Sequence, residues 1–418
     1  YLQDDIRVRK KLTLSPGIRW EVQTHLKQDN AIGPRFGVTW APTKSGHTTF
    51  RASAGIFYDW LSPDTFETTI RQDGFHQQII NVSRQQTCDA DGLNCETTVP
   101  LPYPNPGALA GASVPSDRYL LSPTLHFQHY RRVSAGIDQQ FSTKLRVSTT
   151  YSYVLGDHLW RGDNLNLAVN GVRPDPSFGN VIEVVNDAAS TQHQLSTNFT
   201  FNLAGTGPQP NQYSGPRFQP KRLNINGTYT LGSFRNDADN RFWVPPTGDL
   251  NQEWGPAGGD VRHRIFLGIS SQQVRNFNAN VNMNIASGSP YNETTGEDNN
   301  GDGAYTDRPA GVTRNSLRTP GQFTANASLV YTFVIGHSTL GGVQGVGIQG
   351  GPGGGPNVVT LTNSAPPRYR LQLIAQVQNI TNHANYAGYS GIYGSGFYML
   401  PTTVINPRKV DLGIQISF

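Results

Sequence analysis

Residues 409–418 read KVDLGIQISF. Every second side chain, from Val410 to Phe418, is apolar, whereas the residues between them are polar or small. This period of two residues is that of a β-strand with unlike faces, because successive side chains of a strand point to opposite sides. The stretch therefore predicts a strand that divides an apolar environment from a polar one.

The same alternation recurs in about thirteen segments along the chain. The clearest is FNANVNMNIA at 277–286, in which apolar residues alternate with asparagine. The segments span residues 1–9, 11–22, 33–42, 48–59, 125–141, 144–156, 191–203, 220–232, 262–273, 277–287, 322–335, 368–380 and 408–418. Their regularity predicts an all-β protein of antiparallel strands.

The connections between these segments are of two kinds. Short ones, such as PTKSG at 42–46 and STK at 142–144, predict tight hairpin turns. Long ones span residues 60–124, 157–190, 233–261, 288–321 and 381–407. Short turns at one end and long loops at the other are typical of outer-membrane β-barrels, whose turns are periplasmic and whose loops are extracellular. The glycine-rich stretch within 336–367 falls on the turn side and is interpreted as a periplasmic linker.

Composition favours a membrane barrel over two other classes of protein. No stretch approaches the ~20 apolar residues of a membrane-spanning helix, and only 36% of the residues are hydrophobic. A soluble β-sandwich would also alternate. Here, however, the polar faces carry mostly amides, hydroxyls and glycine, and Trp20, Trp40, Tyr58 and Tyr153 lie near strand ends. Uncharged lumen faces and aromatic girdles predict a transmembrane β-barrel of the outer-membrane type.

Charge and motifs exclude several functions. The net charge of +4 is spread without a basic block, which argues against nucleic-acid binding. The chain has no G-x-S-x-G elbow and no H-E-x-x-H motif, so we expect no catalytic residues, no enzyme activity and no organic cofactor. The two cysteines, Cys88 and Cys95, lie close together in TCDADGLNC. Their proximity favours a local disulfide, with two free thiols as the alternative.

Several stretches resemble the barrel of TonB-dependent outer-membrane receptors, in the Oar-like group that often carries a carboxypeptidase-regulatory-like domain. They are YLQDDIRVRKKLTLSPGIRWE (1–21), IGPRFGVTWAP (32–42), RASAGIFYDW (51–60), DVRHRIFLG (260–268), SGSPYNETTGEDNNGDGAYTDRPAGVTRNSLRTPGQF (287–323) and VQNITNHANY (377–386). The resemblance covers nearly all of residues 1–418. It implies a single barrel domain that forms the C-terminal ~13 strands of a barrel of about 22 strands, without the plug and the first strands.

The resemblance also implies a function and a set of partners. Such receptors take up a scarce, bulky substrate, for example a carbohydrate, a peptide or a metal chelate, across the outer membrane of Gram-negative bacteria. The implied partners are outer-membrane lipid, a plug domain of the same protein, the TonB complex and the barrel assembly machinery, which would read the strand ending in Phe418. The alternative is a surface adhesion or structural barrel without active transport.

One polar stretch has the spacing of a metal site. In EDNNGDG (297–303), Asp298, Asn300 and Asp302 are two residues apart and precede a glycine. This is the first half of a calcium-binding loop, in which alternate oxygens converge on one ion. The second half is missing, because the twelfth position is Pro309 and Asp307 comes early. The stretch is therefore either a structural calcium site or a polar turn formed by Asx side chains.

Aromatic residues in the long loops are candidate substrate contacts. Rings held on loops can stack on sugars and other flat ligands. The alternative is that the loops pack against one another through these rings. The candidates are Trp160, Trp243, Trp254, Tyr389 and Tyr393.

Overall fold

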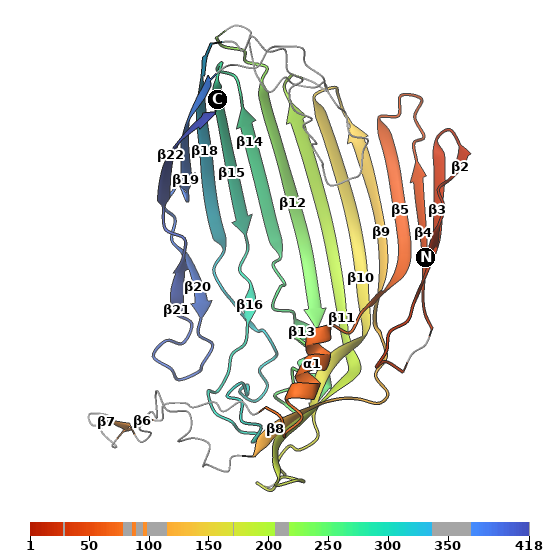
Figure 1. The fold of residues 1–418 in the computed structure, drawn as a ribbon, viewed down its shortest axis with the longest axis vertical. Coiled ribbons are helices and arrows are strands. Elements are labelled where there is room, and N and C mark those ends of the chain that lie inside the picture. The colour runs from red at the N-terminus through yellow and green to blue at the C-terminus, as the bar shows by residue number, and fades with distance from the viewer. Residues whose placement is uncertain are drawn as a thin grey trace.

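The computed structural model describes residues 1–27, 30–77, 115–169, 171–204, 217–336 and 369–417, together with the backbone of β6 (Gln86–Cys88) and β7 (Cys95–Thr97). Among the described residues, 16 of the 22 strands belong to one sheet, and the other six form three separate pairs. Its strands run between an end with short connections, here the turn end, and an end with long connections, the loop end (Figure 1).

The path of the sheet follows the chain. The strand order is β1-β3-β4-β5-β9-β10-β11-β12-β14-β15-β18-β19-β22, and each neighbouring pair is antiparallel. The bounds are β1 (Leu2–Gln3), β2 (Ile6–Arg9), β3 (Leu12–Glu21), β4 (Ala31–Trp40), β5 (Thr48–Asp59), β9 (Gln128–Gln140), β10 (Leu145–Asn164), β11 (Phe178–Asn202), β12 (Leu223–Asn236), β14 (His263–Ser271), β15 (Phe277–Ala286), β18 (Gln322–Ile335), β19 (Tyr369–Gln378) and β22 (Lys409–Ser417). Each segment predicted from the alternation contains one strand of this path, and the first is divided into β1 and β2. The predicted all-β, antiparallel fold is confirmed.

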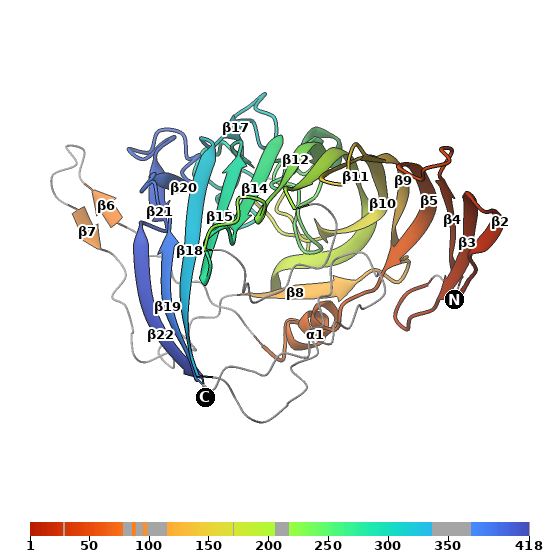
Figure 2. The ribbon, with the colours of Figure 1, turned by 90° about the horizontal axis from the view of Figure 1, so that it is seen from above.

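The sheet is curved and open. Seen from above, its strands follow an arc from β22 to β2 (Figure 2). Among the described residues, β22 pairs only with β19, and β1 and β2 pair only with β3. The two edges of the arc are therefore not joined to each other in this part of the chain.

The pairing keeps the two faces of the sheet chemically distinct. Leu373 lies opposite Ile414, and the ladder continues in the same register along β19 and β22. Leu412 and Ile414 are 80% and 71% exposed, which suits hydrocarbon as surroundings far better than water. Aromatic rings lie at both ends of this apolar face, with Trp20 near the loop end and Trp40 near the turn end. A continuous ladder also satisfies the backbone polar groups where no water can reach them.

The long connections contain more regular structure than the sequence predicted. The expected loop 157–190 is reduced to residues 165–177, because β10 and β11 extend well beyond the alternating segments. Outside lipid, connections fold onto these strands and bury side chains such as Trp160 and Val184, so the simple apolar–polar alternation is lost. Register shifts at Gly156, Leu159 and Arg161 disturb the pattern further.

Other connections carry short elements that pack at the loop end of the 16-stranded sheet, which we call the wall. Within 60–124 lie helix α1 (Pro63–Arg71) and β8 (Ser116–Leu121), which runs parallel to β11 and departs from the antiparallel rule. The remaining elements are the 3₁₀ helix η2 (Leu250–Glu253), β13 (Gly255–Pro256), the pair β16 (Pro290–Tyr291) and β17 (Leu317–Arg318), and the hairpin β20 (Asn385–Tyr389) and β21 (Pro401–Ile405).

The hydrophobic core is small and lies at the loop end. Leu125, Phe127, Trp160 and Val184 are buried there together with Leu61, which precedes α1. Wall side chains face either outward or into the arc, so close packing occurs mainly where connections fold onto the strands. Among the described residues, no helix is long and apolar enough to cross a membrane. The predicted linker 336–367 lies almost entirely outside the described residues, as does Phe418.

Candidate functional site

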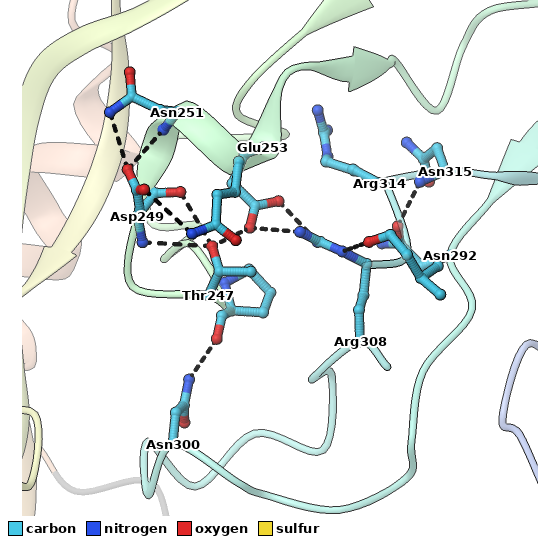
Figure 3. Close-up of polar contacts among 12 residues, drawn as sticks. Thr247, Asp249, Asn251, Glu253, Asn292, Asn300, Arg308, Arg314 and Asn315 are labelled. Atoms are coloured by element: carbon cyan, nitrogen blue, oxygen red, sulfur yellow. Dashed lines mark hydrogen bonds and ion pairs between the residues drawn. The ribbon is translucent and has the colours of Figure 1, made fainter. Parts of the chain in front are cut away.

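Two long connections are joined at the loop end by a buried ion pair. The Arg308 guanidinium donates to both carboxylate oxygens of Glu253, at 2.8 and 2.7 Å (Figure 3). The side chains of Glu253 and Arg308 are 0% and 2% exposed, and the Thr247 hydroxyl donates a third hydrogen bond to Glu253 at 2.7 Å. Such bidentate, charge-assisted bonds fix the orientation of both groups. They lock the connection 233–261 to the connection 288–321.

The position of Glu253 follows from the local sequence. Asp249 is the N-cap of η2, and its carboxylate accepts the Asn251 backbone N–H at 3.0 Å. The hydrogen bond satisfies a donor that a helix start leaves free. The bonded N-terminus also holds the pKa of Asp249 below its usual value. The capped turn then presents Glu253, its last residue, to Arg308.

A second buried guanidinium ties the same connections to the wall. Arg314 is 0% exposed and donates to the backbone and side-chain oxygens of Asn236, at 2.8 and 2.7 Å. It also pairs with Asp239 and lies over the ring of Trp243, 5.3 Å from its centre. Asn236 is the last residue of β12, so Arg314 connects the loops to the loop end of the sheet.

A third ion pair joins the two connections close to where they meet the sheet. Asp260 is 2% exposed, accepts the Phe234 backbone N–H at 2.8 Å and forms an ion pair with Arg318. Arg262 lies two residues after Asp260 in the sequence, and its guanidinium nitrogen is 3.8 Å from the Asp260 carboxylate. The three buried charge contacts make this part of the loop end a stiff platform.

The EDNNGDG stretch forms a compact turn on this platform. Asp298 accepts the backbone N–H groups of Gly301, Asp302 and Gly303 at 2.8, 3.1 and 2.9 Å. The Asn300 amide donates to the Pro246 carbonyl at 2.9 Å (Figure 3). The Asx turn expected as one alternative is therefore present. In the described part of the chain, no three His, Cys, Asp or Glu side chains already stand in an arrangement that could hold a metal ion.

The turn is also joined to the β10–β11 connection. The Asn180 amide donates to the Asp302 carbonyl at 2.6 Å, and the Arg173 guanidinium donates to the Gly301 carbonyl at 3.0 Å. Three connections that are far apart in sequence therefore meet at residues 298–303.

The structure separates the five aromatic candidates. Trp160 is only 5% exposed, belongs to the core and donates its indole N–H to the His126 carbonyl at 2.8 Å, so its ring is not offered at the surface. Trp243 is half-buried beneath Arg314, as the loop-packing alternative predicted. Trp254 is 37% exposed with Arg235 over its ring. These two tryptophans therefore have positively charged neighbours.

The tyrosine candidates lie on the β20–β21 hairpin. The ring of Tyr389 is 6.1 Å from that of Tyr291, which belongs to the connection 288–321. Tyr393 is 64% exposed and packs edge-on against Tyr398 at 5.7 Å. The Tyr398 hydroxyl donates to Glu293 at 2.9 Å, and this bond raises the tyrosine pKa. Of the five candidates, Tyr393 has the most accessible ring and Tyr389 is braced by a second loop.

The cysteines lie on strands whose backbone alone is described. Cys88 and Cys95 are direct partners in the antiparallel pair β6–β7. Directly opposite residues of an antiparallel pair have Cα atoms within disulfide reach. The backbone is compatible with the disulfide, which stays a prediction.

The sequence patterns gave no sign of two further features of the structure. One is a pair of buried asparagines: Asn385 exchanges two hydrogen bonds of 2.8 Å with the backbone of Phe323, and Asn379 donates to the carbonyls of His383 and Asn406. Buried amides that bond backbone on both sides have no periodicity to reveal them. The other is a shallow recess of about 330 Å³ on the polar face. It is lined largely by amides and hydroxyls, among them Asn282, Asn326, Ser328, Gln376 and Gln378.

Comparison with known families decides the identity of the wall. The outer membrane beta barrel domain matches residues 26–409. The chain belongs to this family. It is accordingly a protein of the outer membrane, and the predicted localisation is confirmed. Among curated proteins, no sequence matches the chain.

Solved structures show the same fold at low identity. The outer membrane transporter YddB from Escherichia coli is 12% identical over 97% of this chain, with a TM-score of 0.57. The ferric enterobactin receptor PfeA from Pseudomonas aeruginosa is 12% identical over 99% of this chain, with a TM-score of 0.54. The FrpB iron transporter from Neisseria meningitidis is 11% identical over 99%, with a TM-score of 0.50. This outer-membrane barrel chain spans only 43%, 44% and 43% of those three chains.

Proposed function

We propose that this chain forms the C-terminal wall and the outer loops of a TonB-dependent outer-membrane transporter. The observation that carries the proposal is the two-faced, open arc. Its apolar face suits lipid, whereas its other face presents uncharged polar side chains such as the asparagines of β15. A lumen lined by amides and hydroxyls can exchange hydrogen bonds with a plug or a passing solute without holding ions tightly.

The width of the arc supports a place within a larger barrel. Its edges remain unpaired in the described part of the chain, and an open sheet edge is not tolerated in hydrocarbon. The solved outer-membrane transporters that share the fold are more than twice as long. A barrel of about 22 strands with a plug is the assembly that the Oar-like resemblance implies, and coupling to the TonB complex would come from the plug side.

The loop end supports capture of a bulky substrate. The buried pairs Glu253–Arg308 and Arg314–Asp239 hold the connections in place. Exposed rings such as Tyr393 then offer a preorganised contact for a carbohydrate, a peptide or a metal chelate.

The experiment is energised uptake by cells. A deletion strain is complemented with the complete gene, and uptake of labelled oligosaccharides, peptides and iron chelates is followed with and without a protonophore. We expect one class to be lost on deletion, restored by the gene and blocked by the protonophore. Unchanged uptake of all classes by the deletion strain would contradict the transporter proposal. Tyr393→Ala should weaken apparent affinity roughly 3–10-fold, whereas Tyr305→Ala, another exposed loop tyrosine, should not.

Surface adhesion is a second candidate function. The observation in its favour is the apolar β20–β21 hairpin, where Ile392, Phe397 and Met399 are 44%, 65% and 50% exposed. Exposed apolar patches often mark protein contacts. Loss of cell–cell or cell–matrix attachment in the deletion strain, with uptake unchanged, would favour adhesion.

A further inference from the structure

Three carboxylates and an amide gather in the turn 298–307. The turn contains Asp298, Asn300 and Asp302, and Asp307 folds back beneath it. The Asp307 Oδ2 atom accepts the backbone N–H groups of Asn299 and Asn300 at 2.5 and 3.2 Å. The fold therefore brings the acid that was too early for a standard calcium loop under the residues that have the calcium spacing.

The second oxygen of Asp307 has no donor. Asp307 is 5% exposed, and its Oδ1 atom is buried without a hydrogen-bond partner in the structure. A buried carboxylate oxygen left unpaired is costly, because it has lost water and gained nothing in exchange. The carboxylate is held under the turn through Oδ2, which leaves Oδ1 as the oxygen that lacks a partner.

No described cation compensates these charges. Neither lysine nor arginine forms an ion pair with Asp298, Asp302 or Asp307 among the described residues. Arg308, which follows Asp307 directly, is committed to Glu253. Arg173 reaches the turn but donates to a backbone carbonyl there.

We propose that the turn 298–307 binds a calcium ion through side-chain oxygens of Asp298, Asn300, Asp302 and Asp307. Calcium accepts six to eight oxygens in flexible geometry, which suits ligands drawn from an irregular turn. The Asp298 Oδ2 atom accepts one N–H bond and keeps a lone pair for the ion, whereas Oδ1 already accepts two N–H bonds. The side chain of Asp302 must turn to bring its oxygens around the ion, whereas Asp307 stays held through Oδ2 and offers its unpaired Oδ1.

A bound ion would strengthen the link between three connections of the loop end. Its backbone is held by Arg173 and Asn180 from one connection and its amide by Pro246 from another. Calcium would therefore stiffen the loop end as a whole, with an affinity of roughly 10⁻⁴–10⁻³ M, as for other extracellular calcium modules.

The test uses the purified product of the complete gene in detergent micelles, freed of metal with a chelator. Terbium is titrated first, with excitation through tyrosine, because Tyr305 lies two residues from Asp307 and is 60% exposed. Calcium is then added as competitor, with magnesium in parallel. We expect saturable terbium emission that calcium displaces at least tenfold more effectively than magnesium.

Single substitutions of the proposed ligands test where the ion binds. Asp307→Asn and Asp302→Asn should each weaken calcium competition at least tenfold. The matched control is Asp73→Asn, which removes another carboxylate that accepts two backbone N–H groups, and it should change the affinity less than twofold. Emission that does not saturate, or an Asp307→Asn variant that binds like the unmodified chain, would overturn the proposal.

A measurement on the unmodified chain covers the case of variants that fail to fold. Calcium should slow proteolysis within 288–321 at least tenfold relative to chelator, with magnesium having little effect. An unchanged cleavage rate would count against the site.

Discussion

Removal of the Arg308 guanidinium should release the loop platform. In Arg308→Met, the Glu253 carboxylate remains buried with the Thr247 hydroxyl as its one remaining described side-chain partner. Two charge-assisted hydrogen bonds are lost, at about 1.5–3 kcal/mol each. Breaking a buried pair from one side costs about 3–5 kcal/mol, because the remaining charge is uncompensated. We expect a loss of that size in the local stability of the two connections.

Amide hydrogen exchange of the complete gene product in micelles measures this loss. A local opening that is easier by about 3–5 kcal/mol speeds exchange roughly 10²–10⁴-fold. The acceleration should be confined to residues 233–261 and 288–321, and the strands of the wall should keep their protection. Exchange in these connections that stays within threefold of the unmodified chain would refute the reasoning.

Two further variants separate charge burial from loss of packing. The double variant Glu253→Leu/Arg308→Met should recover most of the stability, because no buried charge is left behind. Arg71→Met removes an exposed arginine whose ion pair with Glu67 has side chains 58% and 61% exposed, and it should cost less than about 1 kcal/mol. A double variant as unstable as Arg308→Met would point to packing as the cause.

Three other outcomes follow from single contacts. Gly288→Ala places a Cβ against the Thr319 carbonyl and should cost about 1–3 kcal/mol in thermal unfolding, whereas Gly258→Ala, with open space around it, should be nearly neutral. Asn385→Asp removes the N–H donor to a backbone carbonyl and should cost about 1–3 kcal/mol in denaturant unfolding, with Asn382→Asp as an exposed comparison. Backbone N–H groups of Phe75 and His76 hold the pKa of Asp73 at about 2, against a usual value of 3.8. The stabilisation from these hydrogen bonds should therefore be complete above pH 4 and lost as the pH falls towards 2. NMR titration of the unmodified chain should show this transition, and Asp73→Asn should lack it.

The wall was predictable because the membrane imposes a simple rule. In β15 and β22, each side chain faces either hydrocarbon or a polar lumen, and the two-residue period records that choice directly. The strand bounds therefore agree closely with the alternating segments. Where β10 leaves the lipid, connections fold onto it and bury side chains such as Trp160, so the strand continues after the two-residue pattern has ended.

The loop platform was not predictable by the same means. Arg308 and Glu253 are 55 residues apart, and Arg314 and Asn236 are 78 apart. No local spacing relates such partners, because only the folded sheet brings their connections together. The calcium spacing at Asp298 was visible in the sequence, but the place of Asp307 beneath it depended on the return of the chain.

The strands β10 and β11 are much longer than the width of the membrane requires. β11 has 25 residues, which at about 3.3 Å per residue extends over roughly 80 Å, far more than the ~25–30 Å of hydrocarbon. The paired strands therefore continue well beyond the lipid, whereas β14 and β15 stop after 9 and 10 residues. The connection 288–321 extends beyond those shorter strands and contacts Arg173 and Asn180, beside the outer end of the β10–β11 pair. The long pair thus gives the connections of the shorter strands a fixed support outside the membrane.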